Sequence, residues 1–237
     1  MIVFPLSLLP FPFCLFPFAF SLVPFVKPIY PIARKSNLAE DYHGLRVADP
    51  YRWLEDPVNM ETVAWVEAQN ALTRSSLQGP VRNALVKRLT ELYDFPRTNV
   101  PFKRGRHYFY THNTGLQDQP VLYVQEAPDG PRRVLIDPNA MNADGPVALT
   151  ALAVNEAGTL AAYGLSQSGS DRQEIFLRDV ETGVDRPDRL HWVKFASIAW
   201  VRDGSGFYYT RFPEPGTVAP GDENYFNTVH YHRLGGP

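Results

Sequence analysis

The chain has 237 residues, 44% hydrophobic and 20% charged, which is enough apolar material for one large or two small folded domains. Its formal net charge of −2 gives no electrostatic case for nucleic acid or an anionic membrane surface as a partner. The single cysteine, Cys14, excludes an intrachain disulfide, and no Cys/His cluster has the spacing of a zinc site. We expect neither a metal nor a cofactor, and a reducing compartment fits this composition.

Residues 1–27 differ in composition from the rest of the chain. No charged side chain precedes Lys27, and Phe, Leu and Pro dominate. Such an apolar stretch suggests a cleavable signal peptide or a membrane anchor. However, it lacks a basic start, and its repeated prolines would interrupt a helix in lipid, where lost hydrogen bonds are costly. A signal peptide, a disordered extension and a mis-assigned reading frame therefore all stay open, and a membrane role is not expected.

The stretch DYHGLRVADPYRWLED, residues 41–56, concentrates acids, arginines and aromatic side chains. Its density resembles an active site, but aromatic residues also cover apolar surface, and charged residues also pair with each other or cap helices. We interpret it as a structural clasp, by which we mean the side chains of Tyr42, Arg52, Trp53, Glu55 and Asp56. His43 is a conceivable general base, but no serine or carboxylate is placed beside it, so a structural hydrogen-bonding role is favoured.

Two helices are predicted after this segment. The first opens at Pro57 and covers residues 58–77, which contain good helix formers and no Gly or Pro. The second starts at Pro80, whose missing N–H is harmless in a first turn, and ends before Pro96. Its apolar residues follow a helical spacing and form one stripe. They are Val81, Leu85, Leu89 and Leu92.

From about residue 98 the helical period is replaced by short runs of aromatic and β-branched residues separated by turn signals. FKRGRHYFY, VNEAGTLAAYG and VRDGSGFYYT share one form, with a glycine turn between two apolar strands. Their glycines, Gly105, Gly158 and Gly204, stand 53 and 46 residues apart. A four-stranded unit repeating at 40–50 residues is typical of β-propeller blades. Residues 98–237 hold two such units and the start of a third, which is fewer blades than a closed ring requires.

Few residues in the β-rich region offer chemistry. Ser168 and Ser205 lie in SQSGSD and DGSG, in predicted turns and not at a strand-to-helix elbow, so neither is expected to be a nucleophile. His230 and His232 alternate along a predicted strand, which would place both on one face. A metal site could begin this way, but no third ligand is indicated, so ordinary strand residues are the favoured interpretation.

Several motifs together resemble the prolyl oligopeptidase family of serine peptidases. YHGLRVADPYRWLED, WVEAQN and ELYDFP are similar to its N-terminal signature. YFYTHNTGLQDQPVLYVQ, LIDPN, AYGLSQSGSD and VKFASIAW are similar to its first blades. These motifs occur in the family's order between Tyr30 and His232, which makes the resemblance much more specific than any one of them.

The resemblance implies an architecture. In the family, an α/β-hydrolase domain sits on a seven-bladed propeller, and an N-terminal helical segment belongs to the hydrolase domain. The fold expected here is therefore an α+β fragment, with the helical arm of the hydrolase over residues 28–97 and two to three blades of an incomplete propeller over residues 98–237. The resemblance also implies that Phe195 lines an apolar substrate subsite and that Asp171 faces the hydrolase domain. The alternatives are core packing for Phe195 and an ordinary turn role for Asp171.

The family cleaves short peptides after proline, and its nucleophile, acid and histidine lie in the C-terminal half. No G-x-S-x-G nucleophile elbow occurs in these 237 residues, so we expect no catalytic residue here and no activity from this chain alone. Its expected partners are a hydrolase domain and, through it, short proline-containing peptides. The alternative is a non-catalytic module that associates through open blade edges. The cytoplasm is the expected location, or the exterior if residues 1–26 act as a signal peptide.

Overall fold

The computed structural model describes residues 28–141, 145–195 and 197–236, so the predictions for the apolar leader lie outside the described residues. The chain divides into two compact units, Met1–Asn83 and Ala84–Pro237. Within the described ranges, no helix combines the length and the apolar character needed to cross a bilayer.

The first unit begins with a hairpin of β1 (Ala39–Tyr42) and β2 (Leu45–Ala48). Tyr42 pairs with Leu45, so the connection has two residues, His43 and Gly44, both with positive φ. This backbone matches the twist of the flanking strands and is the geometry favoured for two-residue hairpin loops. The Asp41 carboxylate accepts a 2.7 Å hydrogen bond from the Gly44 amide and closes the turn.

The first helix is shorter than predicted. A 3₁₀ turn, η1 (Arg52–Glu55), comes first, and α1 runs from Met60 to Leu77. The predicted start at Pro57 is wrong, because the Asn59 side chain accepts a 2.8 Å bond from the Glu61 amide and caps the helix there. The preceding residues form a turn, in which the Asp56 carboxylate accepts from the Val58 amide.

The second helix, α2, spans Pro80–Tyr93, as its start signal predicts. Its apolar stripe is not buried. Leu85 is 58% exposed and Leu89 52% exposed. The helix itself is confirmed, and the predicted apolar stripe is exposed along with the rest of α2.

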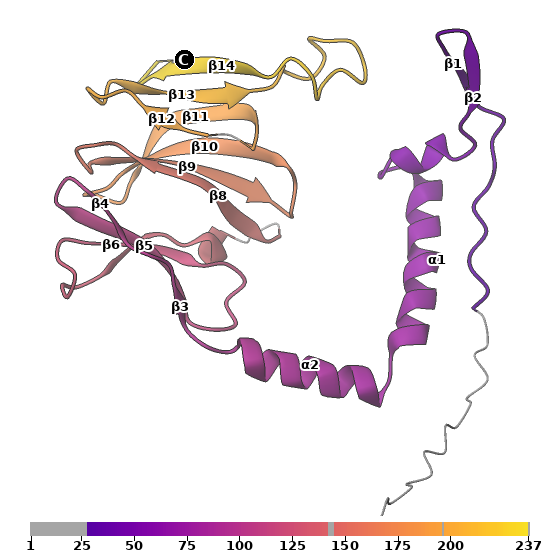
Figure 1. Ribbon diagram of the computed structural model, residues 1–237, viewed down its shortest axis with the longest axis horizontal. Coiled ribbons are helices and arrows are strands. Elements are labelled where there is room, and N and C mark those ends of the chain that lie inside the picture. Colours follow the sequence, from indigo (N-terminus) through magenta and orange to yellow (C-terminus); the bar gives the residue numbers. More distant parts are fainter. Residues whose placement is uncertain (1–27, 142–144, 196, 237) are drawn as a thin grey trace, which may run out of the picture. The chain divides into compact units, whose positions relative to one another are not determined.

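After α2, the second unit contains three antiparallel sheets, which we call blades 1, 2 and 3 (Figure 1). Blade 1 contains β3 (Arg97–Thr98), β4 (Phe102–Arg104), β5 (His107–Asn113), β6 (Val121–Gln125) and β7 (Arg133–Ile136), with the 3₁₀ turn η2 (Pro138–Met141) after it. Blade 2 contains β8 (Val147–Val154), β9 (Leu160–Gln167), β10 (Arg172–Asp179) and β11 (Asp185–Lys194). Blade 3 contains β12 (Ala199–Trp200), β13 (Gly206–Arg211) and β14 (Thr228–Arg233).

The strand order within each blade follows the chain. Blade 2 has the order β8, β9, β10, β11, and blade 3 the order β12, β13, β14. Blade 1 has the order β3, β5, β6, β7, with β4 also paired to β5. These meanders confirm the predicted succession of hairpins, and they place β8 and β12 as the first strands of their blades.

Two hydrophobic cores form where neighbouring blades pack together. The core between blades 1 and 2 includes Phe109, Leu122 and Tyr163, and the core between blades 2 and 3 includes Ile175 and Phe207. Blade 2 is buried on both faces because it lies between the other two. Its strand β9 is accordingly apolar at consecutive positions, unlike a strand with one face in water.

Polar contacts also join the blades. The Arg178 guanidinium of blade 2 donates a 2.6 Å bond to the Leu135 carbonyl of blade 1 and binds the Asp185 carboxylate at 2.7 Å. The Tyr163 hydroxyl donates to the same carboxylate at 2.9 Å. Asp185 and Tyr163 hold the Arg178 guanidinium within blade 2, and its bond to Leu135 links blade 2 to blade 1.

Candidate functional site

The two site residues implied by the family resemblance lie at one end of blade 2. Arg172, the first residue of β10, pairs with Lys194, the last residue of β11. Asp171 precedes the first of these residues and Phe195 follows the second, so the pairing brings the two predicted residues to the same end of the sheet. We refer to this as the Phe195 end of blade 2.

The conformations at this end are unusual. Phe195 is 74% exposed and has a φ of 47°, and Trp192 has a φ of 62°. Phe195 therefore lies outside both hydrophobic cores described above. Left-handed backbone is unfavourable for bulky residues and persists where the surroundings impose it. Whether Phe195 meets substrate stays a prediction.

Asp171 ends the turn between β9 and β10. Ser168 and Gly169 in this turn have positive φ, and the Ser166 hydroxyl donates to the Ser170 carbonyl. The Asp171 side chain is exposed. The turn therefore presents this carboxylate to the outside, and its predicted role at a domain interface stays a prediction.

The acidic and aromatic segment that precedes α1 forms a hydrogen-bonded network. The Arg52 guanidinium donates to Glu40 at 2.7 Å and to Asp49 at 2.5 Å, and the Tyr42 hydroxyl donates to Glu40 at 2.9 Å. The Arg52 hydrogen bond, helped by Tyr42, holds the pKa of Glu40 below its usual value. Every one of these charged groups has a structural partner, as the clasp interpretation predicts.

A second set of contacts joins this network to α1. The Trp53 indole donates to the Arg34 carbonyl at 2.9 Å, and its own carbonyl accepts from the buried Thr62 hydroxyl at 2.9 Å. Arg34 forms a two-pronged pair with Glu61 at 2.7 and 2.9 Å. The predicted clasp thus fixes the start of α1, although Glu55 contributes only a 3.6 Å contact with Arg52.

Among the described residues, no imidazole forms a hydrogen bond with either serine that was weighed as a nucleophile. The Ser205 hydroxyl donates to the Asp203 carboxylate at 2.8 Å and lies 3.2 Å from the Tyr231 hydroxyl, and Ser168 is in a hairpin turn. Acyl transfer requires a serine next to a base, usually an imidazole. His43, which was considered above as a general base, is in the β1–β2 turn.

The two alternating histidines of β14 have separate partners. His230 lies 2.9 Å from the Thr228 hydroxyl, whereas His232 is 3% exposed and its Nε2 lies 2.7 Å from a carboxylate oxygen of Asp188. Across the described ranges, no three His, Cys, Asp or Glu side chains gather closely enough to hold a metal ion.

The contact between Asp188 and His232 joins blade 2 to blade 3. Asp188 is on β11, and its carboxylate also accepts a 2.8 Å bond from the Gly235 amide. Burial alone would raise the pKa of Asp188, but the bonds from Gly235 and His232 outweigh burial, so this pKa lies below its usual value. Sequence reasoning missed this pair, because the partners are 44 residues apart and no local pattern links them.

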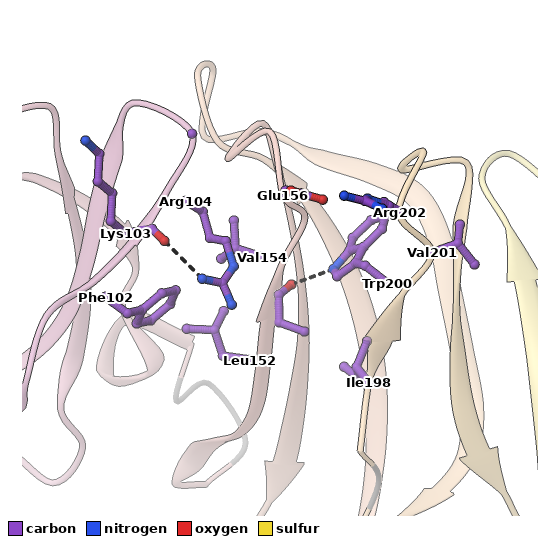
Figure 2. Close-up of a pocket in the computed structure, with 12 residues that line it drawn as sticks. Phe102, Lys103, Arg104, Leu152, Val154, Glu156, Ile198, Trp200, Val201 and Arg202 are labelled. Atoms are coloured by element: carbon purple, nitrogen blue, oxygen red, sulfur yellow. Dashed lines mark hydrogen bonds between the residues drawn. The ribbon is translucent and has the colours of Figure 1, made fainter.

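An open groove of about 900 Å³ runs across β4 of blade 1, β8 of blade 2 and β12 of blade 3 (Figure 2). Its wall combines apolar and basic side chains, and the Trp200 indole donates to the Ala153 carbonyl at 2.9 Å across the boundary between blades 2 and 3. The lining residues are Phe102, Lys103, Arg104, Gly105, Leu152, Ala153, Val154, Glu156, Ile198, Trp200, Val201 and Arg202.

The repeat contained a signal for this groove. Lys103, Glu156 and Arg202 each stand two positions before a repeat glycine, and all three line the groove. Equivalent positions of successive blades thus face one concave surface, with two cations and one anion. The described lining of the groove contains no Ser, Cys or His side chain.

The sequence matches the family described as "Prolyl oligopeptidase, N-terminal beta-propeller domain" over residues 30–237. The prolyl endopeptidase of Elizabethkingia meningoseptica is 37% identical over 209 residues, which cover 87% of this chain and 29% of that protein. Prolyl oligopeptidase A of Galerina marginata is 35% identical over 244 residues, covering 88% of this chain and 32% of that protein. The chain thus spans about a third of the length of these relatives.

Solved structures agree with the sequence match. One from a structural and mechanistic study of two prolyl endopeptidases has a TM-score of 0.79 and 33% identity, covering 88% of this chain and 31% of that one. Prolyl oligopeptidase B from Galerina marginata, bound to a 35-residue substrate, has a TM-score of 0.72 and 28% identity, covering 88% of this chain and 32% of that one. The chain belongs to the prolyl oligopeptidase family, and its three blades are part of that family's N-terminal β-propeller.

Proposed function

We propose that this chain provides the first blades and the N-terminal helical arm of a proline-specific serine peptidase, and that it does not hydrolyse peptides by itself. The supporting observation is its 37% identity to a prolyl endopeptidase across 87% of the chain, combined with a sequence that lacks a G-x-S-x-G elbow. The machinery for acyl transfer then comes from an α/β-hydrolase domain, and this chain contributes scaffold and substrate access.

Within this proposal, the Phe195 end of blade 2 faces the hydrolase domain. The exposed ring of Phe195 supplies an apolar wall for a short proline-containing peptide, and the exposed carboxylate of Asp171 pairs with a basic group of the hydrolase domain. The exposed stripe of α2, which includes Leu85 and Leu89, packs on that same domain. Each of these groups is exposed in the described structure, as a group that awaits a partner should be.

A chimaeric enzyme tests the proposal. Residues 30–237 replace the matched segment of the Elizabethkingia meningoseptica enzyme, and cleavage of a fluorogenic peptide after proline is measured. We expect turnover from the chimaera, none from a chimaera whose nucleophilic serine is replaced by alanine, and none above background from the 237-residue chain. A folded chimaera without activity, or turnover by the isolated chain that a serine-directed phosphonate blocks, would overturn the proposal.

A second candidate is a non-catalytic module that binds other chains through an open blade edge. The edge strand β14 favours it, since Val229 is 70% exposed and Tyr231 46% exposed. Sedimentation of the purified chain separates the two candidates, because a dedicated module forms a defined oligomer or complex. For either candidate we propose the cytoplasm as the location, on the basis of the single cysteine and the lack of glycosylation sequons.

A further inference from the structure

The loop between β13 and β14, residues 212–227, is attached to the Phe195 end of blade 2. The Phe212 amide donates a 2.9 Å bond to the Trp192 carbonyl. The Lys194 ammonium donates to the Asn224 side-chain oxygen and lies 5.5 Å from the centre of the Phe212 ring. The loop therefore holds the last residues of β11 by a backbone bond, a charge-assisted bond and a cation–π contact.

The packing between this loop and β11 leaves little empty space. Trp192, Val193 and Lys194 face Phe212, Pro213, Pro215 and Glu223 across a cavity of only about 20 Å³. A gap of this size has room for about one water molecule, so the two segments lie close together. On its other side, β11 is fixed by β10 through the pairs Arg172–Lys194 and Gln173–Val193.

These contacts surround residues 192–195, the segment whose backbone conformation is least favourable at this end of blade 2. Trp192 and Phe195 both have left-handed φ values, and Phe195 gains little from burial because it is 74% exposed. Such conformations are retained only where neighbouring contacts impose them. Lys194 is the residue directly before Phe195, so its bond to Asn224 sets the point from which the Phe195 ring projects.

We propose that Lys194 and Asn224 are positioning residues for Phe195, holding its exposed ring in the orientation that contacts substrate. This inference rests on the proposed function, because it deepens the role given there to Phe195. The loop acts as a brace and not as a contact surface of its own: without the bond between Lys194 and Asn224, the ring samples several orientations and the subsite loses its shape. Preorganisation of this kind affects binding of the peptide more than the chemical step.

A direct measurement on the 237-residue chain tests the brace without any need for activity. 4-Trifluoromethylphenylalanine is placed at position 195, and its ¹⁹F resonance is recorded. We expect Asn224→Ala and Lys194→Met to broaden or split the resonance. Asn224→Asp should preserve one sharp signal, because a carboxylate still accepts from the ammonium. Thr217→Ala is the matched control, since its hydroxyl bonds within the loop to the Glu214 carbonyl at 2.6 Å.

The same variants in the chimaeric enzyme test the consequence for substrate. We expect Asn224→Ala to raise KM for a prolyl peptide about tenfold with kcat little changed, which is the effect of losing one charge-assisted bond. Asn224→Asp should restore KM, and Thr217→Ala should leave it unchanged.

The two measurements keep the inference separate from the function on which it rests. A ¹⁹F spectrum that Asn224→Ala leaves unchanged, in a chain with an unaltered circular dichroism melt, overturns the brace. A changed spectrum with an unchanged KM in an active chimaera overturns the role toward substrate. Loss of activity already in the unsubstituted chimaera overturns the proposed function, while the ¹⁹F result still decides the brace.

Discussion

Gly105 and Gly158 pack against each other across the boundary between blades 1 and 2. The Gly105 amide donates a 3.0 Å hydrogen bond to the Glu156 carbonyl. A Cβ atom on Gly105 would lie 2.0 Å from the Ala157 carbonyl oxygen, and one on Gly158 would lie 2.3 Å from the Arg104 carbonyl oxygen. Both residues have positive φ, so the spacing of the repeat reflects two requirements that only glycine meets together.

Substitution of either glycine should therefore separate the blades. We expect Gly105→Ala to lower the free energy of unfolding by about 3 kcal/mol, combining the left-handed backbone with overpacking against a fixed carbonyl group. Gly169→Ala is the matched control, because its φ is also positive and no atom lies within 4 Å of its Cβ position. It should cost only about 1 kcal/mol. Equal losses in urea unfolding of the two variants would contradict the role of the inter-blade contact.

Local signals were sufficient to predict the succession of hairpins in the three blades, but not the hairpin of β1 and β2. The hairpins around Gly105, Gly158 and Gly204 were recognisable because turn glycines and alternating apolar residues act within a few positions of each other. The start of α1 was misplaced because both Pro57 and Asn59 are plausible helix starts, and the choice depends on which amide is capped. The residues two positions before the repeat glycines, Lys103, Glu156 and Arg202, could have indicated the groove. The shape of the groove, however, depends on how the blades pack.

Long-range contacts could not be predicted in this way. Asp188 and His232 meet only after two blades have formed, and no spacing in the sequence encodes their pairing. Family resemblance implied a substrate subsite for Phe195 and a surface facing the hydrolase domain for Asp171. Their shared end of blade 2 follows from the register of β10 and β11. The resemblance supplied the roles of these residues, which the isolated sequence does not contain.

The buried pair of Asp188 and His232 should stabilise blade 3 against blade 2. We expect Asp188→Ala to lower the free energy of unfolding by about 3 kcal/mol, since it leaves a buried imidazole and the Gly235 amide without their acceptor. Thermal or urea unfolding measures this loss. Asp203→Ala is a suitable control, because within the described ranges the exposed Asp203 side chain bonds only to the nearby Ser205, and its loss should change stability much less.

The pKa of Asp188 also sets a pH dependence. Because the folded pKa lies below the unfolded value of about 3.9, the carboxylate stabilises the fold above that value and loses this contribution as pH falls through the folded pKa. We therefore expect wild-type stability to fall more steeply than that of Asp188→Asn below about pH 4. Parallel pH profiles for the two proteins would show that the carboxylate is not the responsible group.

Trp200 should contribute to the contact between blades 2 and 3 through a single hydrogen bond. Trp200→Phe retains an aromatic ring and removes the indole N–H that donates to Ala153. We expect a loss of about 1 kcal/mol, seen as roughly fivefold faster hydrogen exchange of the β8 and β12 amides. Trp53→Phe removes an equivalent bond to Arg34 in the other unit and should leave those amides unaffected. Unchanged exchange in Trp200→Phe would mean that this hydrogen bond does not stabilise the boundary.

Phe195 should matter for peptide binding and not for stability. Its side chain is 74% exposed, so Phe195→Ala should change the free energy of unfolding of the chain by less than about 0.5 kcal/mol. In the chimaeric enzyme, the same substitution should raise KM for prolyl peptides about tenfold, because an aromatic wall of the subsite is lost. Val184→Ala is the matched control, since Val184 is 63% exposed in the loop between β10 and β11, at the opposite end of blade 2. If both substitutions raise KM equally, the effect comes from general disturbance of blade 2, and the Phe195 end has no special relation to substrate. If neither does, Phe195 lies outside the subsite, and its exposed ring and left-handed backbone require another explanation.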